Sequence, residues 1–106
     1  MIEEVRKRLA KYKKEEIKFN EPHFTEQIAS REGNRQEVID NLLNPKRLVY
    51  AYKDRRGKNE IYNLHFKISN TRTMRLPVIF DKDSRKGLYI LTYIMRYRAW
   101  QNMIRK

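Results

Sequence analysis

Residues 48–80 read LVYAYKDRRGKNEIYNLHFKISNTRTMRLPVIF, and this segment determines the class of structure that the chain can form. Apolar and polar side chains alternate over residues 61–68 and again over residues 73–80. A period of two residues is typical of strands that bury one face. Turn-forming residues separate these runs. We therefore predict strands over residues 48–52, 61–68 and 73–80, and a fourth over residues 88–95.

The two middle strands are predicted to form a hairpin. If both strands bury their even-numbered residues, these residues must face one another, and a loop of residues 70–72 satisfies this requirement. Such a register places Lys67 opposite Arg75. Because like charges directly opposite each other destabilise a sheet, this pair favours an anion between the two cations, with His65 one step along the same face.

The N-terminal part of the chain has helical spacing instead. Apolar residues recur every three or four positions and predict an amphipathic helix within residues 1–19. A second helical segment ends at Gly33. Asn34, followed by Glu37 at the spacing of a capping box, then predicts a third helix, which stops at the Asn-Pro pair of residues 44–45.

The predicted fold class is α+β. N-terminal helices pack on a four-stranded, mainly antiparallel sheet, and a short C-terminal helix or docked extension follows within residues 96–106. The chain has 106 residues, which is the size of one domain. We predict a single domain over residues 1–106, with residues 1–45 helical and residues 46–106 forming a β-meander and a basic C-terminal segment.

The charge of the chain is unevenly distributed. Lys and Arg number 25 against 13 Asp and Glu, which gives a formal net charge of +12. Residues 1–45 contain nine basic and nine acidic residues, so the whole excess lies in residues 46–106. Phosphate binding needs cations gathered on one surface. The asymmetry therefore favours a nucleic-acid partner over a merely basic, solvated surface.

Several classes of site are excluded or disfavoured. The chain has no cysteine, and its two histidines lie 42 residues apart, so no zinc-binding spacing is present. Only four acidic residues occur in the basic part, which disfavours a two-metal nuclease. We predict no cofactor and no metal. No apolar run approaches the length of a membrane-spanning helix, so we expect a cytoplasmic protein with no membrane contact.

The basic part supplies side chains that could bind a phosphodiester without a metal. We expect Arg75 to stabilise phosphate charge and His65 to assist proton transfer, although an exposed strand histidine without a role is equally compatible. Tyr93 is more typical of a core residue, but it could also stack on a base. The candidate nucleic-acid contacts from this part are Arg55, Arg56, Lys67, Arg72, Tyr93, Arg96 and Arg98.

The segment HFTEQIASREGNRQEV at residues 23–38, followed by LLNP at residues 42–45, resembles the opening of a group of small prokaryotic toxin-like domains. Over residues 23–95 the order of elements is also similar to the RelE and BrnT toxin superfamily. This resemblance implies a metal-independent endoribonuclease that an acidic antitoxin neutralises. It makes His23 a further catalytic candidate and Arg31 a further contact; the matching residues are His23, Arg31, Glu37, Val38, Asn44 and Pro45.

Three functions remain open. The first is a toxin-like, RNA-binding protein that cleaves RNA through the substrate's own 2′-hydroxyl group. The second is a basic protein that binds RNA or DNA and cuts nothing. The third is a protein-interaction module whose N-terminal helix forms a homodimer or binds an acidic antitoxin. The sequence leaves the choice between a monomer and a homodimer open.

Overall fold

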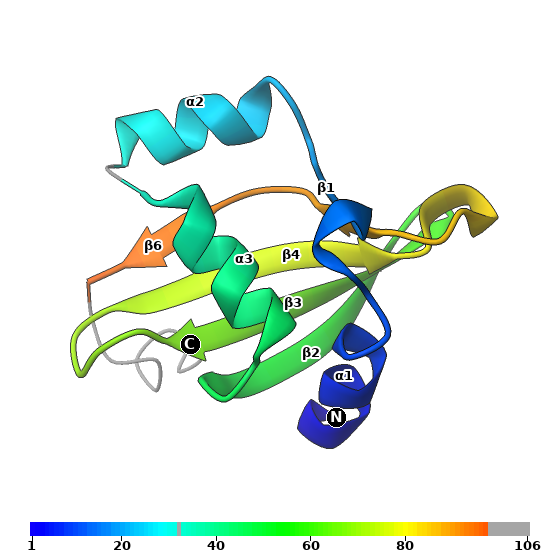
Figure 1. Cartoon of the computed structure of the whole chain (residues 1–106), viewed down its shortest axis with the longest axis horizontal. Coiled ribbons are helices and arrows are strands. Elements are labelled where there is room, and N and C mark those ends of the chain that lie inside the picture. Colours follow the sequence, from blue (N-terminus) through cyan, green and yellow to red (C-terminus); the bar gives the residue numbers. More distant parts are fainter. Residues whose placement is uncertain (32, 98–106) are drawn as a thin grey trace.

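The computed structural model describes residues 1–31 and 33–97, except for the side chain of Arg56. These residues form an α+β structure in which helices lie against one face of a mixed sheet (Figure 1). The helices are α1 (Ile2–Leu9), α2 (His23–Ser30) and α3 (Arg35–Leu43). The strands are β1 (Ile17–Phe19), β2 (Leu48–Arg56), β3 (Asn59–Lys67), β4 (Thr73–Phe80), β5 (Leu88–Ile90) and β6 (Ile94–Arg96). Short 3₁₀ helices cover Lys14–Glu16 and Lys82–Ser84.

The prediction of four mainly antiparallel strands is wrong. Within the described residues the sheet has six strands in the order β1-β5-β4-β3-β2, and β6 also pairs with β4. Strand β1 forms within the segment predicted as helix and runs parallel to β5, with Ile17 opposite Leu88. The predicted strand over residues 88–95 is divided into β5 and β6. Arg96 belongs to β6 rather than to a C-terminal helix, and residues 98–106 lie outside the described residues.

The division of the predicted last strand into β5 and β6 is explained by a proline in the neighbouring strand β4. Pro77 lies in the middle of β4, and its carbonyl oxygen accepts a hydrogen bond from the Leu91 amide, N–O 2.9 Å. The backbone nitrogen of Pro77 points to the same side but has no hydrogen to donate. A proline is therefore compatible with a central strand only where the neighbouring ladder is interrupted. Residues 91–93 form this interruption, between β5 and β6.

The even-numbered side chains of β3 and β4 form the inner face of the sheet. Leu64, Phe66 and Leu76 are fully buried there. Side chains of all three helices complete the same core, and α3 crosses the sheet in front of β3 and β4 (Figure 1). Val5 and Leu9 of α1 are also buried in this core. The apolar stripe of the N-terminal helix therefore packs into the core of the same chain.

The predicted even-to-even pairing of the middle hairpin is confirmed, because Leu64 faces Leu76. The predicted loop is too short, however. The loop covers residues 68–72, so Lys67 faces Thr73 and His65 takes the position opposite Arg75. The predicted cap of α3 is also confirmed, since the Asn34 side chain accepts a hydrogen bond from the backbone amide of Glu37.

Candidate nucleic-acid interface

The outer face of the sheet, which is the face opposite the helices, contains the odd-numbered side chains of β3 and β4. Three of its polar residues are buried: Asn63 is 6% exposed, His65 is 2% exposed and Thr73 is fully enclosed. Buried polar side chains are uncommon unless they have hydrogen-bond partners. This face therefore differs from an ordinary solvated sheet surface and is a candidate for a binding site.

A cavity of about 330 Å³ opens on this face, beside the interruption between β5 and β6. Its apolar wall is formed by Ile61, Pro77 and Leu91, and its polar lining by Asn20, His23, Asn63, Arg75 and Thr92. We call it the outer-face pocket. It brings together two of the three predicted catalytic residues, His23 of α2 and Arg75 of β4, which are 52 positions apart in the sequence.

Strand β1 positions His23 at this pocket. The strand ends at Phe19, and the backbone amide of Asn20 then donates to the carbonyl oxygen of Ile90 in β5. The Asn20 side-chain amide donates to the carbonyl oxygen of Leu91, N–O 3.3 Å. Because these bonds tie the start of α2 to the interrupted strand, His23, the first residue of α2, lies at the rim of the pocket.

The hydrogen bonds around Thr92 define which nitrogen of neutral His23 holds the proton. The Tyr93 amide donates to Gln27 Oε1 at 2.8 Å, which identifies that atom as an acceptor. The Thr92 hydroxyl lies 2.9 Å from the same oxygen and therefore donates to it. The hydroxyl oxygen then accepts from His23 Nε2, 3.1 Å away. In this arrangement Nε2 is protonated and Nδ1 has the free lone pair.

His65 has a different environment from His23. Its side chain is enclosed on β3, and burial together with the neighbouring Arg75 lowers its pKa to about 4. Both ring nitrogens of His65 and Nε of Arg75 are buried, and none has a hydrogen-bond partner among the described residues. His65 is consequently neutral at pH 7, and its nitrogens are not open to solvent in this structure.

The other predicted contacts do not gather at the pocket. Arg31 is exposed after α2 and donates to the carbonyl oxygen of Tyr93, whose side chain is buried in the core. A Cβ atom at Gly33 would lie 2.8 Å from the Tyr93 ring, so this close approach requires glycine. Arg72 forms an ion pair with Glu37, N–O 3.6 Å. The structure thus gives Tyr93, Arg31 and Arg72 structural contacts.

The remaining predicted cations differ in their placement. Arg55 pairs with Glu60 across the β2–β3 hairpin, N–O 3.8 Å. Lys67 and Arg96 are exposed at the ends of β3 and β6, and both face Thr73 of β4 from opposite sides. They therefore form a row with Thr73 on the outer face, next to the row that contains Arg75. The side chain of Arg56 and the whole of Arg98 lie outside the described residues.

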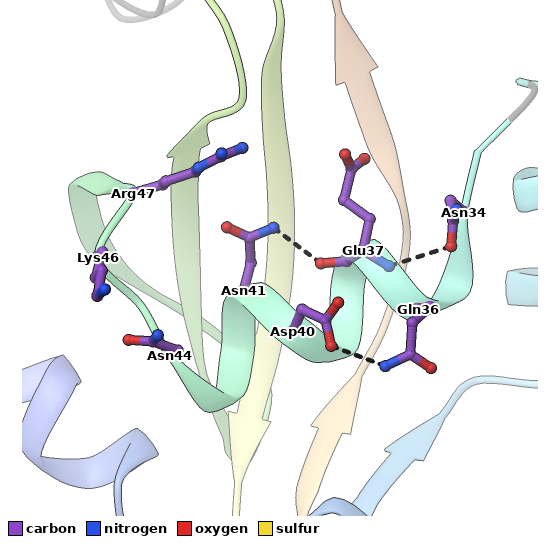
Figure 2. Close-up of a pocket in the computed structure, with 8 residues that line it drawn as sticks. All are labelled: Asn34, Gln36, Glu37, Asp40, Asn41, Asn44, Lys46 and Arg47. Carbon is purple, nitrogen blue, oxygen red and sulfur yellow. Dashed lines mark hydrogen bonds between the residues drawn. The ribbon is translucent and has the colours of Figure 1, made fainter.

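A second, larger cavity of about 450 Å³ lies along α3, and its lining contains none of the predicted site residues (Figure 2). Its polar groups largely bind one another. Gln36 donates to Asp40 at 2.7 Å, and Asn41 donates to the carbonyl oxygen of Glu37 at 2.8 Å. The charges of Glu37 and Asp40 balance those of Lys46 and Arg47. A polyanion would meet both carboxylates, so the outer-face pocket is the better candidate.

Sequence reasoning missed Asn20, Asn63 and Thr92 of the outer-face pocket, as well as Gln27 behind it. Asn20 and Thr92 are brought together by β1 and by the strand interruption. In the sequence, Pro77 is the residue that indicates this interruption. No three acidic or histidine side chains of the described residues lie close enough together to hold a metal ion. No helix in the described part of the chain is long and apolar enough to cross a membrane.

The chain was compared with protein-family models, with curated proteins and with solved structures, and it matches none of them. The resemblance to toxin-like domains therefore stays a prediction, and the functional argument depends on the geometry of the outer-face pocket.

Proposed function

We propose that this protein binds RNA on the outer face of its sheet, with a backbone phosphate in the outer-face pocket. The observation that supports the proposal is the shared position of His23 and Arg75 on one cavity. Arg75 is partly exposed and forms no ion pair within the described ranges, so its charge is available to an anion. A guanidinium group can donate two parallel hydrogen bonds to a phosphate.

Lys67 and Arg96 extend this charge along the outer face. Both are exposed, and both lie in the row next to Arg75. Phosphates recur along a nucleic-acid strand, and each contacted phosphate releases counterions. A row of cations beside a pocket is therefore suited to a polymer backbone better than to a single small anion.

A second candidate function, metal-independent cleavage of RNA, is favoured by the hydrogen bond between His23 Nε2 and Thr92. With Nε2 donating to Thr92, Nδ1 can accept the proton of a substrate 2′-hydroxyl group. The 2′-oxygen then attacks the adjacent phosphorus, the bond to the 5′-oxygen breaks, and that oxygen takes a proton from water. Arg75 would stabilise the charge that develops on the phosphate. The product is a 2′,3′-cyclic phosphate.

Binding and cleavage can be separated with labelled RNA and DNA oligonucleotides in the presence of EDTA. We expect RNA affinity to fall steeply with salt, and Arg75→Ala to weaken binding roughly tenfold while lowering the salt dependence by about one phosphate contact. Arg85→Ala, which removes an equal charge from the exposed loop after β4, is the matched control and should change affinity less. Equal effects of the two substitutions would contradict the proposed site.

Cleavage is tested on the same substrates with His23→Ala. If the protein is a nuclease, this variant should cut RNA at least about a hundredfold more slowly, and its RNA affinity should change much less than its cleavage rate. Tight, salt-sensitive binding without cutting by the unmodified protein would leave the binding function and remove the enzymatic one.

A further inference from the structure

Two tyrosines extend the outer face on the side away from the outer-face pocket. A β-bulge between Leu48 and Tyr50 changes the face that β2 presents, so that Tyr50 faces His65 and Tyr52 faces Asn63. Across the next strand pair, His65 faces Arg75 and Asn63 faces Pro77. Each tyrosine therefore begins a row that continues across β3 to a residue of the pocket.

The rings of Tyr50, Tyr52 and His65 form one aromatic cluster. The ring centroids are 5.6 Å apart between the tyrosines, 5.5 Å between Tyr50 and His65, and 5.8 Å between Tyr52 and His65. Both tyrosine side chains are half-buried, whereas His65 beneath them is enclosed. The tyrosines thus offer exposed aromatic surface on a rigid strand rather than on a loop.

The layer below the tyrosines has unused hydrogen-bonding capacity. Nδ1 and Nε2 of His65 and Nε of Arg75 are buried without partners among the described residues. A buried polar atom without a partner destabilises the folded state, and such atoms in a native structure call for an explanation. A polar ligand seated in the pocket beside Arg75 would explain the Arg75 nitrogen, because it would supply a hydrogen-bond acceptor to that side chain.

We propose that the outer face binds RNA as a single strand, with bases stacked on Tyr50 and Tyr52 while the neighbouring phosphate lies in the outer-face pocket. This inference rests on the proposed function and specifies the form of its substrate. Tyr52 and Pro77 lie on either side of Asn63 in one row, about two strand spacings or ~10 Å apart. A dinucleotide can span that distance.

The choice of a single strand follows from chemistry. In a duplex the faces of the bases are covered by their neighbours, whereas in a single strand they are free to stack on aromatic side chains. Stacking tolerates any base, because every base has a π face. The cations Lys67 and Arg75 provide the charge that a single strand needs along its backbone. The combination therefore predicts binding with little sequence preference.

The inference is tested by fluorescence anisotropy with three labelled probes of equal length: a single-stranded oligoribonucleotide, its duplex, and an abasic oligomer with the same phosphates. We expect the single strand to bind roughly tenfold or more tighter than the abasic oligomer. The double variant Tyr50→Leu/Tyr52→Leu should remove that advantage and leave abasic binding unchanged. Tyr50→Phe/Tyr52→Phe, which keeps both π faces, is the matched control and should bind as the unmodified protein does.

A second readout needs no variant. A 2-aminopurine base in the single strand should lose emission on binding, because it stacks on a ring. Equal affinity for the single strand and the abasic oligomer, or preference for the duplex, would overturn the inference while leaving RNA binding through Arg75 intact. Absence of binding to all three probes would overturn the proposed function as well, so the two failures are distinguishable.

Discussion

The two faces of the pair formed by β3 and β4 differ sharply, although both faces are built by the same two strands. The centre of the inner face is apolar, and Leu64, Phe66 and Leu76 are fully buried against the helices. The outer face buries His65 and Asn63 instead, and it opens into the pocket that Arg75 lines. One face stabilises the fold through apolar burial; the other holds polar groups whose burial costs stability. This cost on one face only is consistent with the binding that we propose there.

The largest expected effect breaks the inner face. Phe66→Ala removes a fully buried ring from the core and should lower the free energy of unfolding by about 3–5 kcal/mol. Urea denaturation followed by circular dichroism measures this loss. RNA affinity at a temperature where the variant is still folded should be unchanged, since Phe66 faces the helices. Weakened binding by the folded variant would show that the two faces are not independent.

An effect of intermediate size comes from His65 and depends on pH. The unfolded chain binds a proton at His65 with a pKa near 6.5, whereas burial lowers the pKa in the folded state to about 4. The contribution of His65 to the free energy of unfolding should therefore be constant above about pH 7 and be lost as the pH drops from about 6.5 towards 4. At about 1.4 kcal/mol per pKa unit, the full loss is about 3 kcal/mol.

Protonation of carboxylates also destabilises the protein in acid. One example is Asp81, whose pKa is lowered mainly by the hydrogen bond from the Gly87 amide. The variant His65→Leu isolates the loss that is due to His65. Denaturation midpoints of both proteins from pH 7.5 to 4 give the comparison. The leucine variant should lose markedly less stability over that range. Parallel curves would mean that His65 is solvated in solution and that the outer face is more open than the structure shows.

The smallest expected effect concerns the rim of the outer face. Lys67 is exposed, so Lys67→Ala should change stability by less than about 0.5 kcal/mol. As a backbone contact it should weaken RNA binding about two- to threefold and reduce the salt dependence slightly. Lys58→Ala at the β2–β3 turn removes the same charge elsewhere and serves as the control. If both variants bind alike, the charge of the outer face acts only through the overall field of the protein.

Local patterns predicted the parts of the fold that local physics decides. The alternation in β3 and β4 identified the buried face, and Asn34 with Glu37 identified the start of α3. Strand β1 was missed because its partner β5 lies 71 positions away in the sequence, and three residues are too few to show a period of two. The division of the last strand is signalled in the sequence by Pro77, which has no backbone N–H to donate to a continuous neighbouring strand.

Local sequence patterns likewise predict individual residues of the candidate site but not how the fold brings them together. His23 and Arg75 were each predicted, but their meeting at one pocket depends on β1 and on the interrupted strand. The polar side of β3 predicted an exposed His65, since alternation distinguishes polar from apolar positions and not exposed from enclosed ones. Tyr50 and Tyr52 cannot be assigned to the outer face from the sequence, because the bulge after Leu48 determines which face they occupy.

The parallel pairing of β1 with β5 also has a consequence for the order of assembly. Ile17 can reach its place only after Leu88 is present and positioned, so the edge of the sheet depends on a contact between distant parts of the chain. Pairings of such high sequence separation are slow to form. During synthesis the N-terminal segment must wait for most of the remaining chain to emerge. Because Asn20 and His23 directly follow β1, the outer-face pocket is complete only after β5 has joined the sheet, and an unfinished chain would lack the site at which we propose RNA binding.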